Sequence, residues 1–274
     1  MSARTHRRRR QQGWIGWRVL RTATVVLGFA FVLGPVLPVV VQAFNDSPVF
    51  PDRMRGLTLH WFTDLLTYDE FVAGTWTSAK IGIGATALAL VLGVSTAFAV
   101  TRGPRWMSGA GVTSVLMGPI VIPQIVVGLA ILQVINQLQL RVGLAGLVVA
   151  HGVFVAPFVI RLVAGALQTQ GTSYEATAMA LGSSPVRVLT TVTFPMLRPA
   201  LIASSVFAFT LSFVNVPLSL FLAPSDQRPL PISIYQQMAS NRSPVLAALS
   251  LLLAVLLLAA AAAVERFLRV RLLQ

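Results

Sequence analysis

Cysteine is absent from this chain of 274 residues, and lysine occurs only once, at Lys80. Without cysteine the chain can form no disulfide, offers no thiolate nucleophile and has no cysteine-ligated metal site. Because Ala79 precedes Lys80 and Ile81 follows it, the chain also lacks the GxxxxGK[ST] loop that cradles nucleotide phosphates. Hydrolysis of ATP by a P-loop in this chain is therefore excluded.

Charged residues are scarce as well. They make up 11% of the chain, against about 25% in an average soluble domain, while 55% of the residues are hydrophobic. A surface with so few charges cannot be mostly in contact with water. The composition therefore indicates a membrane protein.

The sequence also lacks the usual catalytic and metal-binding motifs. The three histidines, His6, His60 and His151, form no HExxH pair, and there is no GxSxG nucleophile turn. An intramembrane enzyme that assembles serine and histidine from different spans would escape such a search, but no residue pattern points to one. We expect no catalytic residue and no metal site.

Six apolar stretches are long enough to cross a bilayer, which takes about 20 mostly apolar residues in a helix. They are Val19–Phe44, Thr75–Val100, Gly111–Ile135, Gly143–Leu167, Pro199–Leu222 and Val245–Leu268. The predicted fold class is thus all-α, a polytopic membrane protein with six transmembrane helices. Prolines within several spans, such as Pro123, predict kinks that neighbouring helices can accommodate.

The first span has an alternative interpretation as a cleaved signal peptide. Arg7–Arg10 would be its charged start, and Val41-Gln42-Ala43 loosely resembles a cleavage site. Its apolar run of about 20 residues, however, exceeds the 7–15 of a signal peptide. We therefore expect a retained span, with residues 1–18 as a basic cytoplasmic tail and residues 19–274 as the transmembrane domain.

Arginine placement predicts the orientation of these spans. If the N-terminus is inside, the inner segments hold fifteen basic residues against two acids, and the outer segments hold six of each. The whole formal charge of +13 then lies on the cytoplasmic side, and both termini are cytoplasmic. The basic tail is thereby explained by topology and contact with anionic lipid, so we expect no nucleic-acid partner.

The segment between the fourth and fifth spans, residues 168–198, is long for a helix connection and is therefore a candidate functional loop. Tyr174–Leu181 has helix-forming residues, and Ser184-Pro185 suits the start of a second helix, with serine as the cap and proline in the first turn. We expect two short helices at the inner surface, with one face available to a partner protein.

This segment resembles the EAA loop of type I ATP-binding-cassette (ABC) importer permeases. Gly182 and Pro195 have the spacing of that motif, whereas Glu175 lies one residue earlier than the usual glutamate. The resemblance implies that the loop couples the permease to an ATPase, and that Glu175 pairs with a basic residue in the loop or on the ATPase. The implied coupling residues are Glu175, Ala178, Leu181, Gly182, Ser184, Pro185 and Pro195.

Other segments are similar to permeases of the spermidine/putrescine type. They are Phe44–Ser47, Leu59–Phe62, Pro123–Gly128, Ser212–Leu222 and Leu230–Ile232. The resemblance implies an inner-membrane importer subunit for a small polar or charged organic solute, of the polyamine, amino-acid-like or aminophosphonate class. It also implies four kinds of partner: a dimer of ATPase subunits that bind ATP and Mg²⁺, a second permease subunit (a different chain, with a copy of this chain as the alternative), an extracytoplasmic solute-binding protein, and lipid. This chain itself would bind no cofactor. The alternative is a secondary transporter or channel that works alone.

Polar side chains within the spans are candidates for the solute path, because such groups are costly in lipid and usually face the bundle interior. In the fifth span Ser205, Ala208, Ser212, Asn215 and Ser219 recur at helical spacing and form one small, polar stripe. The stripe equally suits tight helix packing. Gln124 beside Pro123 is a further candidate. His151, in the fourth span, is either a path residue or a neutral, hydrogen-bonded histidine. The predicted path residues are Gln124, His151, Ser212, Asn215 and Ser219.

Overall fold

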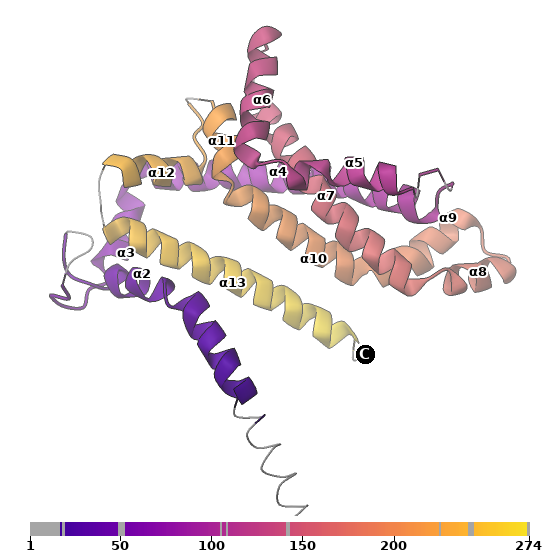
Figure 1. Ribbon diagram of the computed structural model, residues 1–274, viewed down its shortest axis with the longest axis horizontal. Helices are drawn as coiled ribbons and strands as arrows, with labels where there is room; N and C mark the ends of the chain where they lie inside the picture. The colour runs from indigo at the N-terminus through magenta and orange to yellow at the C-terminus, as the bar shows by residue number, and fades with distance from the viewer. Residues whose placement is uncertain are drawn as a thin grey trace, which may run out of the picture. The chain divides into compact units, whose positions relative to one another are not determined.

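The computed structural model describes residues 17, 20–48, 53–104, 106–107, 109–140, 143–224, 226–240 and 244–272. Most of the predicted basic tail, including Arg7–Arg10, lies outside these residues. Within them the chain is helical, with one isolated antiparallel bridge between Asn45 and Leu57, so the predicted all-α class is confirmed (Figure 1). Two compact units are present. The described parts of Met1–Asp64 and Arg242–Leu252 form the first, and those of Leu65–Asn241 and Leu253–Gln274 form the second.

Four of the described helices are long and apolar enough to cross a membrane, and two bent helix pairs raise that number to six if each pair is one span. The four segments are Asp69–Arg102, Leu144–Gln170, Pro185–Phe213 and Pro244–Val264. The bent pairs cover the predicted first and third spans. Their bends are 52° between Leu20–Leu33 and Val36–Ala43, and 101° between Ser114–Val121 and Gln124–Gln137.

In the first unit, the helix Leu20–Leu33 is followed by α2 (Val36–Ala43), and a loop then leads to α3 (His60–Asp64). The bend before α2 lies at Gly34 and Pro35. Proline has no N–H to donate, and glycine has little preference for helix, so the two together interrupt the helical hydrogen bonds. The first unit also contains the beginning of α13 (Pro244–Leu272), up to Leu252.

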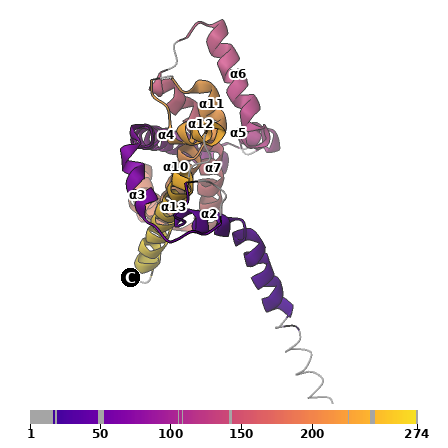
Figure 2. The ribbon, with the colours of Figure 1, turned by 90° about the vertical axis from the view of Figure 1, so that its left-hand side faces the viewer.

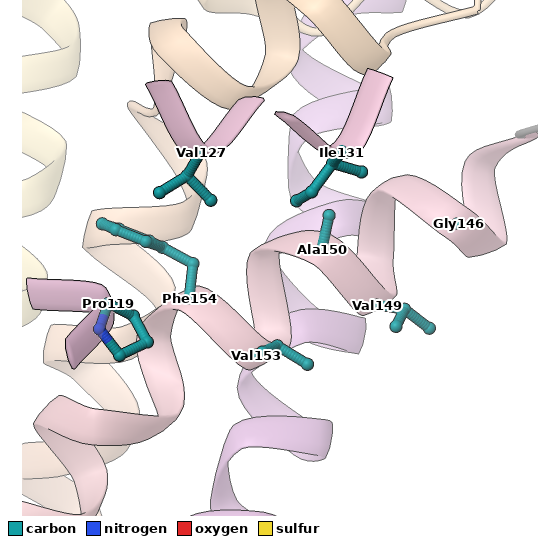
Figure 3. A pocket seen from close by; sticks show the side chains of 8 residues that line it. All are labelled: Pro119, Val127, Ile131, Gly146, Val149, Ala150, Val153 and Phe154. Atoms are coloured by element: carbon teal, nitrogen blue, oxygen red, sulfur yellow. The ribbon is translucent and has the colours of Figure 1, made fainter. Parts of the chain in front are cut away.

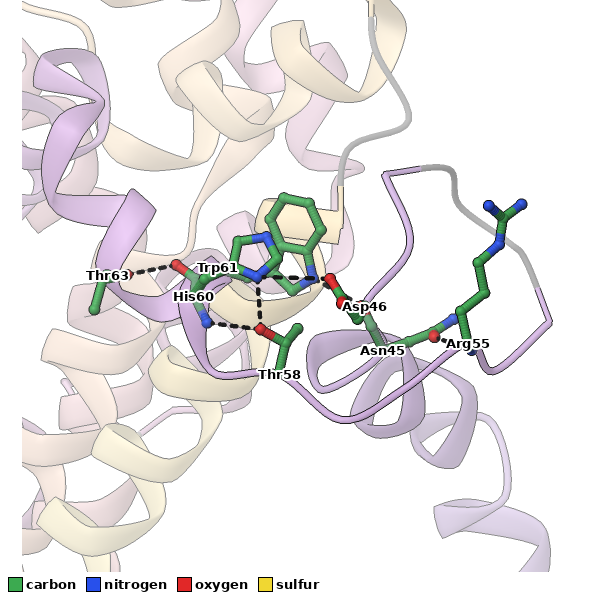
Figure 4. Close-up of polar contacts among 7 residues, drawn as sticks. All are labelled: Asn45, Asp46, Arg55, Thr58, His60, Trp61 and Thr63. Atoms are coloured by element: carbon green, nitrogen blue, oxygen red, sulfur yellow. Dashed lines mark hydrogen bonds and ion pairs between the residues drawn. The ribbon is translucent and has the colours of Figure 1, made fainter.

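The loop between α2 and α3 is held together by Asn45, which is fully buried (Figure 4). Its side-chain Oδ1 accepts from the Arg55 N–H at 2.9 Å, and its Nδ2 donates to the Arg53 carbonyl at 3.1 Å. Its own carbonyl accepts from the Trp61 indole at 2.8 Å. The two sequence motifs Phe44–Ser47 and Leu59–Phe62 therefore stabilise one another in a single hydrogen-bonded loop.

The second unit is built around α4 (Asp69–Arg102), α7 (Leu144–Gln170) and α10 (Phe194–Phe213), which pack side by side (Figures 1 and 2). Ala89, Val159 and Leu197 lie in their common core and are fully buried. The helices α4 and α7 approach closely, because a Cβ on Gly93 would lie 2.6 Å from the Val159 side chain. Small residues permit such close contacts between helices in lipid.

Two helices are interrupted where proline removes a backbone donor. The α5 helix (Ala110–Val121) ends before Pro123, and α6 (Gln124–Gln137) starts directly after it. The α10 helix ends at Phe213, and α11 (Val216–Leu222) starts after Asn215. Pro217 cannot donate to the Phe213 carbonyl, and its ring would clash with that carbonyl, so a continuous helix is disfavoured. The second unit also contains α12 (Leu230–Ser240), which packs on α4 and α11.

The fifth span therefore differs from the prediction. It was expected as one helix over Pro199–Leu222, but the apolar helical segment covers Pro185–Phe213. It includes α9 (Pro185–Val188), a π-helical turn η2 (Leu189–Thr193) and α10. In the π turn the Phe194 N–H bonds to the Leu189 carbonyl. A wider turn directly before Pro195 accommodates a proline that would otherwise clash with the preceding turn.

Candidate solute path and coupling loop

The two helix interruptions of the second unit meet through a pair of amide side chains. Asn215 caps α11, with its Oδ1 accepting from the Leu218 N–H at 3.0 Å. Its Nδ2 donates to Oε1 of Gln124, the first residue of α6, at 3.1 Å. Only 6% of the Asn215 surface is exposed. Asn215 thus satisfies a free N–H at one break while it binds the helix that begins at the other.

His151 joins the same region from the first third of α7. Its Nδ1 lies 3.0 Å from the Ser212 hydroxyl oxygen, and its Nε2 lies 3.3 Å from that of Ser219. Ser212 belongs to α10 and Ser219 to α11, so the imidazole bridges the interruption between them. All three residues are buried. A neutral imidazole can hold both hydroxyls, because one ring nitrogen donates and the other accepts.

All five predicted path residues are therefore gathered in one cluster, in which Gln124 is half-buried and the other four are buried. We call it the amide–imidazole cluster (Gln124, His151, Ser212, Asn215 and Ser219). The single helical stripe predicted from the sequence is wrong, because the helix ends at Phe213 and Asn215 caps a second helix. Tertiary packing, rather than one helix face, brings the residues together. The cluster consists of neutral hydrogen-bonding groups and contains no carboxylate.

A separate cavity of about 260 Å³ lies between α7 and the bent pair α5–α6 (Figure 3). It is lined by Pro119, Val127, Ile131, Gly146, Val149, Ala150, Val153 and Phe154. The lining has no polar side chain that could orient a polar solute. Such a cavity suits apolar groups, and we distinguish it from the amide–imidazole cluster.

The predicted two-helix loop is present between α7 and α10. The α8 helix (Ser173–Ala180) is followed by α9, and the Ser184 side chain accepts from the Arg187 N–H at the start of α9, with Pro185 in its first turn. Ser184 and Pro185 thus have the cap positions expected from the sequence. Ala178 lies within α8, and Pro195 follows the π turn. Leu181 is 82% exposed, and Tyr174, Met179 and Val186 are exposed with it.

Gly182 ends α8 in a left-handed conformation, with φ at +88°. Its N–H bonds to the Met179 carbonyl, and the Ser183 N–H bonds to the Ala178 carbonyl. This is the Schellman arrangement, which satisfies the last carbonyls of a helix and favours glycine. A Cβ on Gly182 would meet no atom of the described residues within 4 Å. Within this chain, glycine is therefore required by the backbone conformation and not by crowding.

Glu175 lies in the first turn of α8 and contacts two other elements. Its Oε2 is 3.4 Å from Nε of Arg102, the last residue of α4, and its Oε1 accepts from the Thr193 hydroxyl at 3.0 Å. The sequence indicated a basic partner for Glu175 in the loop or on an ATPase, but Arg102 lies in neither. From the sequence, Arg102 was only one of the fifteen basic residues placed in the inner segments. The sequence did contain one indication of this pair, because Arg102 lies just after the second span and Glu175 is the only acid in the loop.

A family model described as the inner membrane component of binding-protein-dependent transport systems matches residues 89–270. The chain belongs to this family. The matched region includes α7, the two-helix loop and the amide–imidazole cluster. The chain is accordingly a permease subunit of an ABC importer, a multi-pass protein of the bacterial inner membrane, and a transport subunit rather than an enzyme. The alternative of a transporter that works alone is not favoured.

Two similar permeases come from Escherichia coli strain K12. The putrescine transport system permease protein PotI is 27% identical over 86% of this chain and 85% of its own length. The spermidine/putrescine transport system permease protein PotC is 28% identical over 87% of this chain and 90% of its own length. The resemblance to spermidine/putrescine-type permeases is thereby confirmed.

The fold is also similar to a solved structure. One chain of a bacterial ABC transporter involved in the import of the acidic polysaccharide alginate superposes with a TM-score of 0.66 at 12% identity. The match covers 92% of this permease and 96% of that chain. At this identity the likeness concerns the fold alone, and it supports the type I importer permease architecture.

Proposed function

We propose that this permease forms one transmembrane half of an ATP-driven importer. It pairs with a second permease chain of different sequence, with a dimer of ATPase subunits on the inner side and with a solute-binding protein on the outer side. ATP and Mg²⁺ bind to the ATPase subunits, and this chain binds no cofactor. Both termini and the loop over residues 168–198 lie on the cytoplasmic side, as the arginine distribution predicts.

The observation that carries the proposal is the exposed apolar face of the two-helix loop. Leu181 and Val186 are 82% and 72% exposed at the end of α8 and the start of α9. Leu181 lies outside the apolar spans, and Val186 lies in the first turn of the apolar segment Pro185–Phe213. Exposed apolar residues on a fixed turn favour a docking surface. Gly182 lies between them with open space over its α-carbon, so a partner can approach the backbone closely.

We propose that the amide–imidazole cluster belongs to the solute path. It lies where two spans are interrupted, and interrupted helices are common where transporters bind and release solutes. Its side chains are hydrogen-bonded in two groups, Asn215 with Gln124 and His151 with both serines, and all of them except Gln124 are buried. A path opened here therefore requires that these bonds exchange with the solute or with water. Hydrogen bonds between membrane helices contribute only about 0.6 kcal/mol on average. The free-energy cost of such an exchange is therefore small.

The proposed solute is a small polar or charged organic molecule of the polyamine, amino-acid-like or aminophosphonate class. The similarity to PotI and PotC supports the polyamine class, since putrescine and spermidine appear in their names. The carboxylate-free cluster supports a path that recognises hydrogen-bonding groups and leaves the choice of solute to the binding protein.

The test is assembly followed by ATP hydrolysis. The permease is co-expressed with its ATPase and second permease, purified as a complex and reconstituted with the binding protein. We expect the ATPase to co-purify and its hydrolysis to rise when the binding protein is added. A permease that transports solute without an ATPase would contradict the proposal. Thermal-shift screening of the binding protein against polyamines, amino acids and aminophosphonates then identifies the solute.

A further inference from the structure

We infer that Arg102 is a positioning residue for the coupling loop, and that Arg102 and Glu175 form an internal joint that passes loop movement to α4. The inference rests on the proposed coupling function of the loop. It also assigns Glu175 a different role from the one implied by the sequence, because its carboxylate holds this chain together instead of contacting the ATPase.

Arg102 contacts both Glu175 and the end of α7. Its Nη2 donates to the Leu167 carbonyl at 3.2 Å and to the Gly171 carbonyl. The last carbonyls of a helix have no partner within the helix, and a cationic side chain stabilises them. Gly171 has φ at +66°, so the chain turns there from α7 towards α8. One guanidinium therefore connects the ends of two long helices, α4 and α7, to the base of the loop.

Glu175 extends this connection to the π turn. Its two carboxylate oxygens contact Arg102 and Thr193 respectively, and Thr193 is only 3% exposed. The side chains of Arg102 and Glu175 are 22% and 19% exposed. A carboxylate with one oxygen hydrogen-bonded and the other ion-paired inside its own chain, and with most of its surface covered, is poorly placed to bind a partner.

A further hydrogen bond lies beside the Arg102–Glu175 pair. The Gln170 side-chain amide donates to the Met196 carbonyl at 2.9 Å, which connects the end of α7 with the start of α10. The loop is therefore fixed at its base to α4, α7 and α10, while Leu181 and Val186 at its tip are exposed. Since α4 packs along α7, α10 and α12, movement of the tip reaches the bundle through the charged pair.

The joint is tested with Arg102→Gln, Glu175→Gln and the double variant in the reconstituted complex. For each variant we measure how much ATPase co-purifies, and the rate of ATP hydrolysis with and without the binding protein. We expect each single variant to keep the ATPase bound but to lose stimulation by the binding protein about tenfold, within the usual range of coupling between sites. The double variant should be no worse than either single variant, because both remove one interaction.

Two further variants separate positioning from simple stability. Arg102→Lys keeps a positive charge that can reach Glu175 and a carbonyl, and should restore most of the stimulation. Arg21→Gln, which removes an exposed arginine outside the loop and outside the second unit, is the matched control and should have no effect. If Arg102→Gln does not accumulate in the membrane, Thr193→Val removes one bond to Glu175 and should give the same loss in weaker form.

Three results would overturn the inference. In the first, Glu175→Gln weakens ATPase binding while Arg102→Gln does not, and Glu175 is then an ATPase contact. In the second, both single variants keep normal stimulation. In the third, the double variant loses as much stimulation as the two single variants combined. Gly182→Asp is run in parallel, and if it leaves both ATPase binding and stimulation normal, the coupling function of the loop fails, and not merely the joint.

Discussion

The amide of Asn215 and the amide of Gln124 are hydrogen-bonded at 3.1 Å, although the two residues are 91 positions apart in the sequence. Asn215 caps α11 and Gln124 begins α6, so this bond joins two interrupted helices at their interruptions. The bond places a hydrogen-bonding pair inside the bundle at the points where its backbone is least regular.

Asn215→Leu tests whether this pair belongs to the solute path. The change removes the cap of α11 and the hydrogen bond to the half-buried Gln124 amide, which should destabilise the protein by about 1–3 kcal/mol. If the cluster lines the path, binding-protein-dependent uptake should fall while the complex still assembles. The matched control is Asn136→Leu, because Asn136 is exposed on α6. Unchanged uptake and unchanged assembly would remove Asn215 from both the path and the packing.

Gly182 provides the sharpest test of the coupling loop. Gly182→Asp places a carboxylate at the end of α8, where it opposes the helix dipole, and fills the space that we assign to the ATPase. ATPase co-purification and uptake should both be lost, while the protein still inserts because the spans are unchanged. Gly182→Ala forces a left-handed conformation on alanine, at about 1–2 kcal/mol, and should be less severe.

The control for Gly182 is Gly165→Ala. Gly165 lies within α7 in a conformation that alanine adopts readily, and a Cβ there meets no atom within 4 Å. Uptake by this variant should equal that of the unchanged permease. Normal uptake and normal ATPase binding by Gly182→Asp would mean that this loop does not couple the two subunits.

The proposed orientation is tested by cysteine labelling. The unchanged chain has no cysteine and therefore serves as the unlabelled control. Single cysteines are introduced at Asp64, Ser183 and Arg271. A membrane-impermeant maleimide should label position 64 in intact spheroplasts, and positions 183 and 271 only after the membrane is broken. The opposite pattern would reverse the topology and remove the loop from the cytoplasmic side.

The permease alone should not hydrolyse ATP. It has no phosphate-binding loop, because its single lysine lies between Ala79 and Ile81. The purified chain should release phosphate at the rate of an empty-vector preparation, and hydrolysis should appear only when the ATPase subunits are added. Sustained hydrolysis by the isolated chain, with contaminating ATPases removed, would contradict its assignment as a subunit.

Local chemistry was sufficient for several features of this permease. Composition and apolar run length identified a helical membrane protein. The start of α9 was predictable because a serine followed by proline caps a helix in any context. The glycine at position 182 was likewise predictable as a turn, since its φ of +88° suits glycine above other residues. These properties depend on a residue and its close neighbours in the chain.

Tertiary structure alone decided which distant side chains meet. His151 lies between Ser212 and Ser219 because α7 packs against the helix that Pro217 interrupts, and Asn215 at that interruption is bonded to the distant Gln124. Arg102 pairs with Glu175 because the ends of α4 and α7 meet beside the loop. A sequence pattern reports the period of one helix, and it carries no information on which neighbouring helix supplies the partner for a buried polar group.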